Sequence, residues 1–359
     1  MKAAIAGEKG VEVREVPTPE PAANEILIRV RASSLNRADL LAAQRGGGAR
    51  LGLECAGDVE AVGNAQIGAP APNGRAPTWT PEKSVEAMDR NGIGTAVTSI
   101  SAPGIWFGNN SKARDLARAC NEYSAALVRD YKPRFGMFAV LPLPDVDASL
   151  REIEHAVEVL KTDGIGLMTN HDGRYLGDSS FAPVLEELNR RKAVVYVHPT
   201  SVNCSQCMEQ KLPASAIEFP FDTTRTITSL IYSGTLSRLR DIRFVFSHAG
   251  GTVPFLADRI ARLAQTDERF RSVAPDGPMA ELQRLHYDTA LSANPRMMRS
   301  LQQLVSVEKI LFGTDFPFAP ESTMAASVKG LAALDLSASD LRAIERENAL
   351  RLLPQLRPS

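Results

Sequence analysis

Three side chains that can bind a metal or move a proton each follow a short apolar run. His198 ends the run VVYVH, His248 comes after IRFVFS, and Asp315 comes after ILFGT. Short runs rich in Val, Ile and Phe are typical of β-strands that are buried on both faces. We therefore expect all three residues at the C-terminal ends of buried strands.

Two imidazoles and one carboxylate form a ligand set that suits a divalent first-row metal such as Zn or Fe. A metal in this position would lower the pKa of a bound water molecule to roughly 7. The alternative role for the same residues is to cap the backbone of the loops that follow the strands. The shared placement at strand ends favours the metal site.

The other polar candidates fit ordinary structural roles. His155 lies inside a predicted amphipathic helix and His286 inside a predicted strand, so we expect packing or surface roles for both. His171 follows a predicted strand, where lining a pocket and packing in the core are equally consistent with its position. Cys204 and Cys207 form a lone CxxC, which fits two reduced thiols on a loop better than a zinc site.

Seven predicted strands position these residues, and predicted helices separate one strand from the next. The strands lie at 94–101, 134–141, 164–170, 193–198, 242–247, 285–290 and 308–313. Strands that alternate with helices of ten or more residues indicate a parallel sheet built from βαβ units. Functional residues at the C-terminal strand ends are typical of the (β/α)8 barrel. We predict an α/β fold, a TIM-type barrel over 80–355 whose first strand is atypical or replaced.

Residues 1–66 have a different pattern, and a loop or linker at 67–79 separates them from the barrel. The segments KAAIA, VEVREV and EILIRVRAS alternate like half-exposed antiparallel strands. A closed barrel needs an eighth strand, and residues 25–33 are the best candidate for it. Arg31 and Ser33 would then lie close to the predicted metal site.

Composition excludes several classes of partner. The 359 residues are 44% hydrophobic, and 41 basic and 42 acidic side chains give a net charge of -1. Such a balance does not favour nucleic acid or an anionic membrane as a partner. No apolar run has transmembrane length, the start is too polar for a signal peptide, and four cysteines favour a reducing compartment. We expect a soluble cytoplasmic protein.

From about residue 70 to 355 the chain resembles the metal-dependent amidohydrolase superfamily. The resemblance is to the branch of aminocarboxymuconate-semialdehyde, methylsalicylate and resorcylate decarboxylases. The motifs that carry it are TWTPEKSVEAMDRNGI, KPRFGMFAVLPLPD, VYVHP, RFVFSHAGGTVPFLADRI and ILFGTDFPF. It implies that His198 and Asp315 bind the metal, most simply zinc. It also implies that His248 acts as an acid and base beside the metal-bound water.

The same resemblance implies two arginines that hold the carboxylate of the substrate. Arg75 stands four residues before Trp79, and Arg259 follows the SHAGG motif. In the family the second arginine reaches across the interface of a homodimer. A guanidinium group binds a carboxylate through two parallel hydrogen bonds, which suits this role. A surface ion pair is the alternative for both residues.

The chain departs from the family at its beginning. Family members open with a His-x-His motif that supplies two further metal ligands, and this chain has no such motif. Residues 1–66 instead resemble the N-terminal, GroES-like part of medium-chain quinone oxidoreductases and alcohol dehydrogenases. The carrying segments are VREVPTPEPAANEILIRVRASSLNRADLLAAQRG and LGLECAGDVEAVG. No dinucleotide-binding glycine motif follows, so we expect no nicotinamide cofactor.

These observations lead to three alternative functions. The first is non-oxidative decarboxylation of a small aromatic or unsaturated carboxylic acid by a homodimer. The second is metal-dependent hydrolysis of a lactone or ester, and the third is an inactive, metal-free barrel that acts as a binding protein. With only His198 and Asp315 as ligands, or three with His248, we expect weaker metal binding than in relatives with the complete motif.

Overall fold

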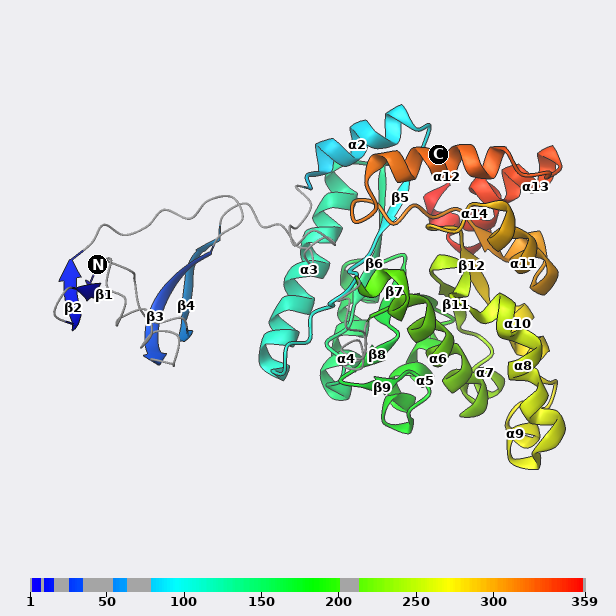
Figure 1. The fold of residues 1–359 in the computed structure, drawn as a ribbon, viewed down its shortest axis with the longest axis horizontal. Helices are drawn as coiled ribbons and strands as arrows, with labels where there is room; N and C mark the ends of the chain where they lie inside the picture. The colour runs from blue at the N-terminus through cyan, green and yellow to red at the C-terminus, as the bar shows by residue number, and fades with distance from the viewer. Residues whose placement is uncertain are drawn as a thin grey trace. The chain divides into compact units, whose positions relative to one another are not determined.

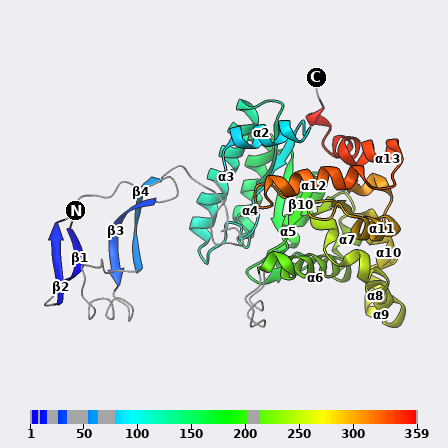
Figure 2. The same cartoon turned by 45° about the horizontal axis from the view of Figure 1, so that its top comes forward.

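The computed structural model describes two compact units, Met1–Ile67 and Gly68–Ser359. The described residues are 2–7, 10–15, 26–34, 54–62, 79–200 and 213–357. Figures 1 and 2 show the described elements from two directions. None of the described helices is both long and apolar enough to cross a membrane.

The N-terminal unit contains two antiparallel strand pairs. Strand β1 (Lys2–Gly7) pairs with β2 (Gly10–Glu15), and β3 (Ile26–Ser34) pairs with β4 (Glu54–Val62). The predicted antiparallel strand character of this segment is therefore confirmed.

Strand β3 is hydrogen-bonded to β4 in a two-stranded sheet. The role of residues 25–33 as the first barrel strand stays a prediction. Strand β4 is nearer in sequence to β3 than any strand of the parallel sheet, so pairing with β4 closes a shorter loop. Arg31 and Ser33 consequently lie on a strand of the small antiparallel pair.

The second unit is built on a curled sheet of seven parallel strands, which confirms the predicted α/β, TIM-type architecture. In sequence order they are β5 (Ala96–Thr98), β6 (Phe135–Val140), β7 (Gly164–Met168), β10 (Val194–His198), β11 (Arg243–Phe246), β12 (His286–Asp288) and β13 (Ile310–Leu311). Each strand pairs with its neighbours in sequence order, and β5 and β13 form the two edges. A short hairpin of β8 (Asn170–His171) and β9 (Arg174–Tyr175) follows β7.

Helices connect the strands and flank the sheet (Figures 1 and 2). They are α2 (Pro81–Arg90), α3 (Asn110–Asp130), α4 (Val146–Glu154), α5 (Ala182–Arg190), α6 (Glu218–Tyr232), α7 (Thr235–Arg238), α8 (Val253–Thr266), α9 (Glu268–Val273), α10 (Pro278–Arg284), α11 (Pro295–Leu304), α12 (Glu321–Ala332), α13 (Ala338–Arg342) and α14 (Asn348–Leu352). Thr80, Asn109, Asp145 and Asn294 are N-caps whose side chains accept a backbone N–H of the first turn. These caps explain why α2, α3, α4 and α11 begin where they do.

The alternation of side chains along β10 places His198 on the inner face of the curled sheet. Val195 and Val197 pack in the main core with the helices, whereas Tyr196 packs against a separate cluster that includes Phe138. Side chains two residues apart on a strand share a face. His198 therefore lies on the same face as Tyr196, turned away from the helix layer.

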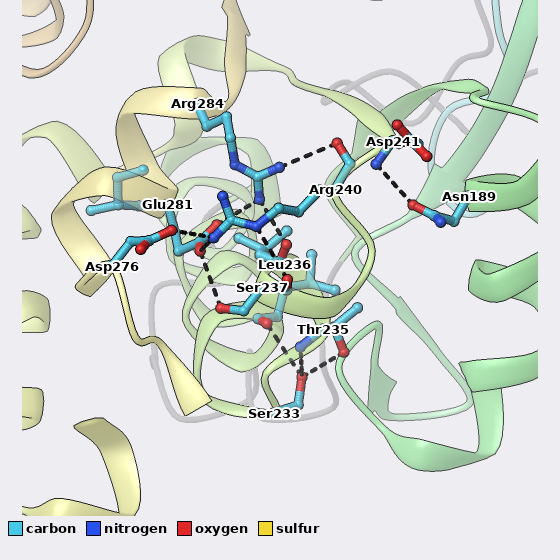
Figure 3. A network of polar contacts seen from close by, with 12 residues as sticks. Asn189, Ser233, Thr235, Leu236, Ser237, Arg240, Asp241, Asp276, Glu281 and Arg284 are labelled. Atoms are coloured by element: carbon cyan, nitrogen blue, oxygen red, sulfur yellow. Dashed lines mark hydrogen bonds and ion pairs between the residues drawn. The ribbon is translucent and has the colours of Figure 1, made fainter. Parts of the chain in front are cut away.

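A buried ion-pair network joins α10 to α7 and the turn that follows α7 (Figure 3). The Glu281 side chain is only 1% exposed and accepts hydrogen bonds from Arg284 at 2.5 Å and from Arg240 at 3.3 Å. Ser237 donates a further hydrogen bond to Glu281 at 3.1 Å, and Arg240 also pairs with Asp276. The network therefore ties α10 to α7 through one buried carboxylate.

Candidate active site

The ends of β10, β11 and β13 bring His198, His248 and Asp315 together, as predicted from the sequence. One ligand atom from each residue lies within 4.8 Å of the other two. Asp315 Oδ1 is 3.8 Å from His198 Nε2, and Asp315 Oδ2 is 3.8 Å from His248 Nε2. In the described part of the chain this is the one group of at least three potential ligands that meets such a distance limit.

The spacing of these atoms fits a bound cation. A separation of 3.8 Å is too long for a direct hydrogen bond. Metal–ligand bonds to histidine nitrogen and carboxylate oxygen are about 2.0–2.2 Å, so two ligand atoms on one ion are commonly 3–4 Å apart. The donor set and its geometry are therefore compatible with a divalent metal.

A hydrogen bond to the backbone shows which ring nitrogen of His198 carries a proton. Its Nδ1 lies 2.8 Å from the carbonyl oxygen of Pro199, an acceptor, so Nδ1 carries the proton and donates. Nε2 is the ring nitrogen that remains available for a metal, and it lies 3.8 Å from Asp315 Oδ1. A backbone acceptor on one ring nitrogen is the usual support for a histidine that binds metal through the other.

His248 lies in a strained turn after β11. His248 and Ala249 both have a φ of 54°, a left-handed conformation that is uncommon for residues other than glycine. The two glycines that follow are also left-handed, and an added Cβ would meet the Tyr287 ring at 2.6 Å from Gly250. The turn thus needs glycine at position 250.

Neighbouring carboxylates raise the pKa of His248. Burial disfavours the imidazolium form, but Asp315 and then Asp288 outweigh burial and leave the pKa above its usual value. For Asp315, burial opposes the charged form, but the nearby His198 and His248 outweigh burial and hold its pKa well below the usual range. The site therefore favours an ionised carboxylate beside a histidine that binds its proton tightly.

Asp288 is the last residue of β12. In the sequence it is only one of several polar residues at the ends of predicted strands. In the structure its Oδ1 accepts the backbone N–H groups of His248 at 2.8 Å and Ala290 at 2.9 Å. Its Oδ2 accepts a hydrogen bond from the Tyr196 hydroxyl at 3.1 Å. Burial raises the pKa of both Asp288 and Tyr196. Asp288 holds the turn of His248 in place.

A cavity of about 330 Å³ lies at the ends of β5, β6, β7 and β10. Ile105, Trp106, Met168, Asn170 and Thr200 are among the residues that line it, whereas His198, His248 and Asp315 are not. Met168 is paired with His198 in the register of the sheet, so one wall of the cavity lies next to His198. Walls that combine apolar side chains with a few polar groups are common in small-molecule sites.

His171 also lines this cavity, which confirms the pocket role that its position allowed. Its Nε2 is buried without a hydrogen-bond partner, and burial, with a further contribution from Arg174, lowers its pKa to about 3. The imidazole is therefore neutral at physiological pH. His286 is buried at the start of β12 and His155 lies in the π-turn after α4, both outside the ligand group.

Of the two predicted carboxylate-binding arginines, the structure describes only Arg259. Arg75, Cys204 and Cys207 lie outside the described residues. Arg259 is exposed on α8 and makes no hydrogen bond or ion pair with any residue that the structure describes. Its role therefore stays a prediction.

A family model described as amidohydrolase matches residues 26–355, a range that includes β3 and β4. The chain belongs to the amidohydrolase family. Decarboxylase yanB from Aspergillus niger is 39% identical over 294 residues, which are 78% of this chain and 80% of that protein. The 6-methylsalicylic acid decarboxylase of Penicillium expansum is 35% identical over 286 residues, which are 78% of this chain and 88% of that enzyme.

Solved structures show the same fold. An amidohydrolase II superimposes with a TM-score of 0.75 and 26% identity, covering 80% of this chain and 93% of that chain. A dihydroxybenzoic acid decarboxylase from Polaromonas, solved with bound manganese and the inhibitor 2-nitroresorcinol, has a TM-score of 0.71 and 21% identity. That comparison covers 78% of this chain and 87% of the Polaromonas chain.

Proposed function

We propose that this chain is a metal-dependent carboxy-lyase that removes CO2 from a small aromatic carboxylic acid without oxidation. The observation that carries the proposal is the group of His198, His248 and Asp315 at the strand ends. A cavity one wall of which, at Met168, lies next to His198 offers room for the acid. The decarboxylases among its relatives support the same reaction class.

His198 and Asp315 would hold the metal, because their donor atoms face each other and His198 is already in the required tautomer. When bound, a divalent metal supplies positive charge that orients and polarises the acid. Metals of this kind include zinc, our expectation from the resemblance, and manganese, which the Polaromonas structure contains.

His248 is the proton donor in this proposal. Its Nε2 lies 3.8 Å from Asp315 Oδ2, beside the proposed metal position, and the imidazolium form would transfer a proton to the ring carbon that bears the carboxylate. The bond from that carbon to the carboxylate then breaks, its electron pair returns to the ring, and CO2 leaves. Ile105, Trp106 and Met168 hold the ring and exclude water from it.

The carboxylate clamp and the oligomeric state are part of the same proposal. Arg259 is exposed and unpaired among the described residues, which suits a guanidinium that serves a second subunit of a homodimer. Arg75 is the second proposed carboxylate-binding residue. Replacing either arginine by a shorter, uncharged side chain would weaken substrate binding more than it slows the bond-breaking step.

The domain organisation is also a proposal. Residues 1–66 form a GroES-like fragment, 67–79 a linker, and 80–355 the amidohydrolase-related barrel. Two observations support this arrangement: the chain divides into two compact units, and the antiparallel pairs β1–β2 and β3–β4 lie in the first of them. A cytoplasmic location goes with the low cysteine content.

A direct assay tests the reaction class. Purified protein is loaded with zinc or manganese and supplied with 2-hydroxybenzoic acids and, separately, with aromatic lactones. We expect CO2 release that a chelator abolishes and that His248→Ala lowers by about 10²- to 10⁴-fold, the usual contribution of general acid catalysis. Lactone opening without CO2 release would favour the hydrolase instead, and metal-independent ligand binding without turnover would favour the binding protein.

A further inference from the structure

A second cavity lies near the C-terminal end of the chain and shares no lining residue with the cavity beside His198. Its volume is about 350 Å³, and its lining consists of Arg346, Glu347, Leu350, Arg351 and Arg357. This volume is within the range of about 300–1,000 Å³ that small-molecule sites have. We call it the arginine cavity.

The lining of the arginine cavity carries an excess of positive charge. Three guanidinium groups and one carboxylate give it a net charge of +2. The carboxylate of Glu347 lies 3.8 Å from the guanidinium group of Arg351, so one of the three arginines has a counter-ion within the lining. Arg346 and Arg357 make no side-chain hydrogen bond or ion pair with any residue that the structure describes. Two unpaired guanidinium groups in one cavity favour a ligand with two negative charges.

Hydrogen bonds attach the backbone beneath the arginine cavity to β13 and to the turn before it. Asn348 is 1% exposed, and its Nδ2 donates to the carbonyl oxygens of Val307 and Ile310, each at 2.8 Å. Its Oδ1 accepts a hydrogen bond from Arg351 at 3.0 Å. The π-turn Ala343–Glu347 and α14 carry four of the five lining residues. These arginines therefore project from a rigid base, which lowers the entropic cost of binding a ligand.

The chemistry of the lining indicates which anion fits. The planar guanidinium group of arginine matches the oxygens of a phosphate group and binds two of them at once. A phosphate monoester is a dianion above its second pKa of about 6, so its charge complements that of the lining. Leu350 adds an apolar wall, which the organic part of an ester can contact.

We propose that the arginine cavity is a binding site for a small organic phosphate, which its three arginines hold with the organic part against Leu350. The site is separate from the candidate active site. Helix α14 is hydrogen-bonded to Ile310 at the start of β13, whereas Asp315 follows the end of that strand. The inference goes beyond the proposed function and does not depend on it.

The probe is n-butyl phosphate, because it lacks the aromatic ring of the proposed substrate, and inorganic phosphate serves for comparison. Titration calorimetry on the metal-loaded full chain at pH 7.5 measures both dissociation constants. Arg346→Gln, Arg351→Gln and Arg357→Gln each remove one positive charge from the lining. Glu347→Gln removes the opposing carboxylate. Arg342→Gln is the matched control, because Arg342 is an exposed arginine about one helical turn before Arg346 and does not line the cavity.

We expect one n-butyl phosphate to bind per chain, more tightly than inorganic phosphate. Each of the three arginine variants should weaken binding by about 2- to 5-fold, the effect of one exposed ion pair. Glu347→Gln should strengthen binding by a similar factor, and Arg342→Gln should leave it unchanged. All the side chains that are replaced are exposed, so each variant should fold, which thermal unfolding checks.

Equal weakening by Arg342→Gln and Arg346→Gln would reduce the effect to the overall charge of the surface and overturn the site. Binding that no arginine variant weakens would overturn it as well, and so would the absence of saturable binding. Equal affinities for the two phosphates would overturn the assignment to an organic phosphate. Sedimentation of the full chain with vesicles of phosphatidylcholine and phosphatidic acid, lost in Arg346→Gln, would assign the phosphate group to a membrane and overturn the soluble ligand.

Discussion

At the scale of single residues, the site depends on side chains that place other side chains. Asp288 is not one of the three predicted site residues that cluster at the strand ends, yet its Oδ1 accepts the backbone N–H of His248. The left-handed φ of His248 costs conformational energy, and this hydrogen bond helps to offset it.

The Asp288 contact predicts a contrast between two substitutions. Asp288→Asn keeps an oxygen acceptor for the backbone of His248, so we expect a change in kcat of only a few-fold. Asp288→Ala removes the acceptor, and a misplaced proton donor should lower kcat by about 10²-fold. Steady-state kinetics with a metal analysis of each variant measures both effects. A kcat for Asp288→Ala within a few-fold of wild type would show that the turn holds itself.

Gly250 gives a second prediction at this scale. Its φ is +73°, and a Cβ would meet the ring of Tyr287 at 2.6 Å. Gly108 also has a positive φ, +79°, but nothing lies within 4 Å of its added Cβ. We expect Gly108→Ala to cost about 1 kcal/mol from backbone strain and Gly250→Ala to cost about 1–3 kcal/mol more from overpacking. Urea unfolding measures both, and equal losses would contradict the packing argument.

At the scale of elements, the seven parallel strands and the longer helices could be predicted because apolar runs and capping residues mark them locally. The hairpin of β8 and β9 and the short α7, α9 and α10 were not predicted, since they carry no strong periodicity. The hydrogen bonds that Asp222 accepts from Thr169, Asn170 and Tyr175 could not be predicted either. These partners lie 47 to 53 residues away in sequence, and only the packing of α6 against the end of β7 joins them.

The ion-pair network of Glu281 predicts that replacing Glu281 lowers the free energy of unfolding more than replacing the neighbouring Asp276 does (Figure 3). Glu281→Ala removes the buried carboxylate that Arg284 and Arg240 share, and we expect a loss of about 1.5–3 kcal/mol in the free energy of unfolding. Asp276 pairs with the same Arg240 from an exposed position, so Asp276→Ala should cost at most about 1 kcal/mol. Similar losses for the two variants, measured by urea unfolding, would argue against the buried network.

At the scale of the whole molecule, the clustering of His198, His248 and Asp315 was predictable from strand-end positions, whereas the partner of β3 was not. The choice of residues 25–33 as a barrel strand relied on strand character and on the distance along the chain to Trp79, and neither specifies a partner. The pairing with β4 leaves β5 and β13 as the edges of the parallel sheet in the described residues.

Buried histidines predict how the stability of the whole chain depends on pH. The folded-state pKa is about 3 for His171 and about 4 for His286, mainly because burial disfavours the charged form. Both values lie below the unfolded value of about 6.5. The unfolded chain therefore binds more protons between these limits, so stability is complete above about pH 6.5 and falls as the pH drops toward 4.

The measurement compares the free energy of unfolding at pH 7 and pH 4.5 for the wild type and His171→Gln. We expect the variant to lose less stability than the wild type over this interval, because one proton-binding difference has been removed. An equal loss in both proteins would mean that His171 is not held neutral by the fold.

The central claim is that His198, His248 and Asp315 form a metal-dependent decarboxylation site. Its most direct test is the release of labelled CO2 from carboxyl-labelled 2-hydroxy-6-methylbenzoic acid by the purified, metal-loaded full chain. We predict release by the wild type that chelation removes and metal restores, and that His248→Ala and Asp315→Asn lack. Release that persists in those variants or after chelation would contradict the account, as would its absence from the metal-loaded wild type.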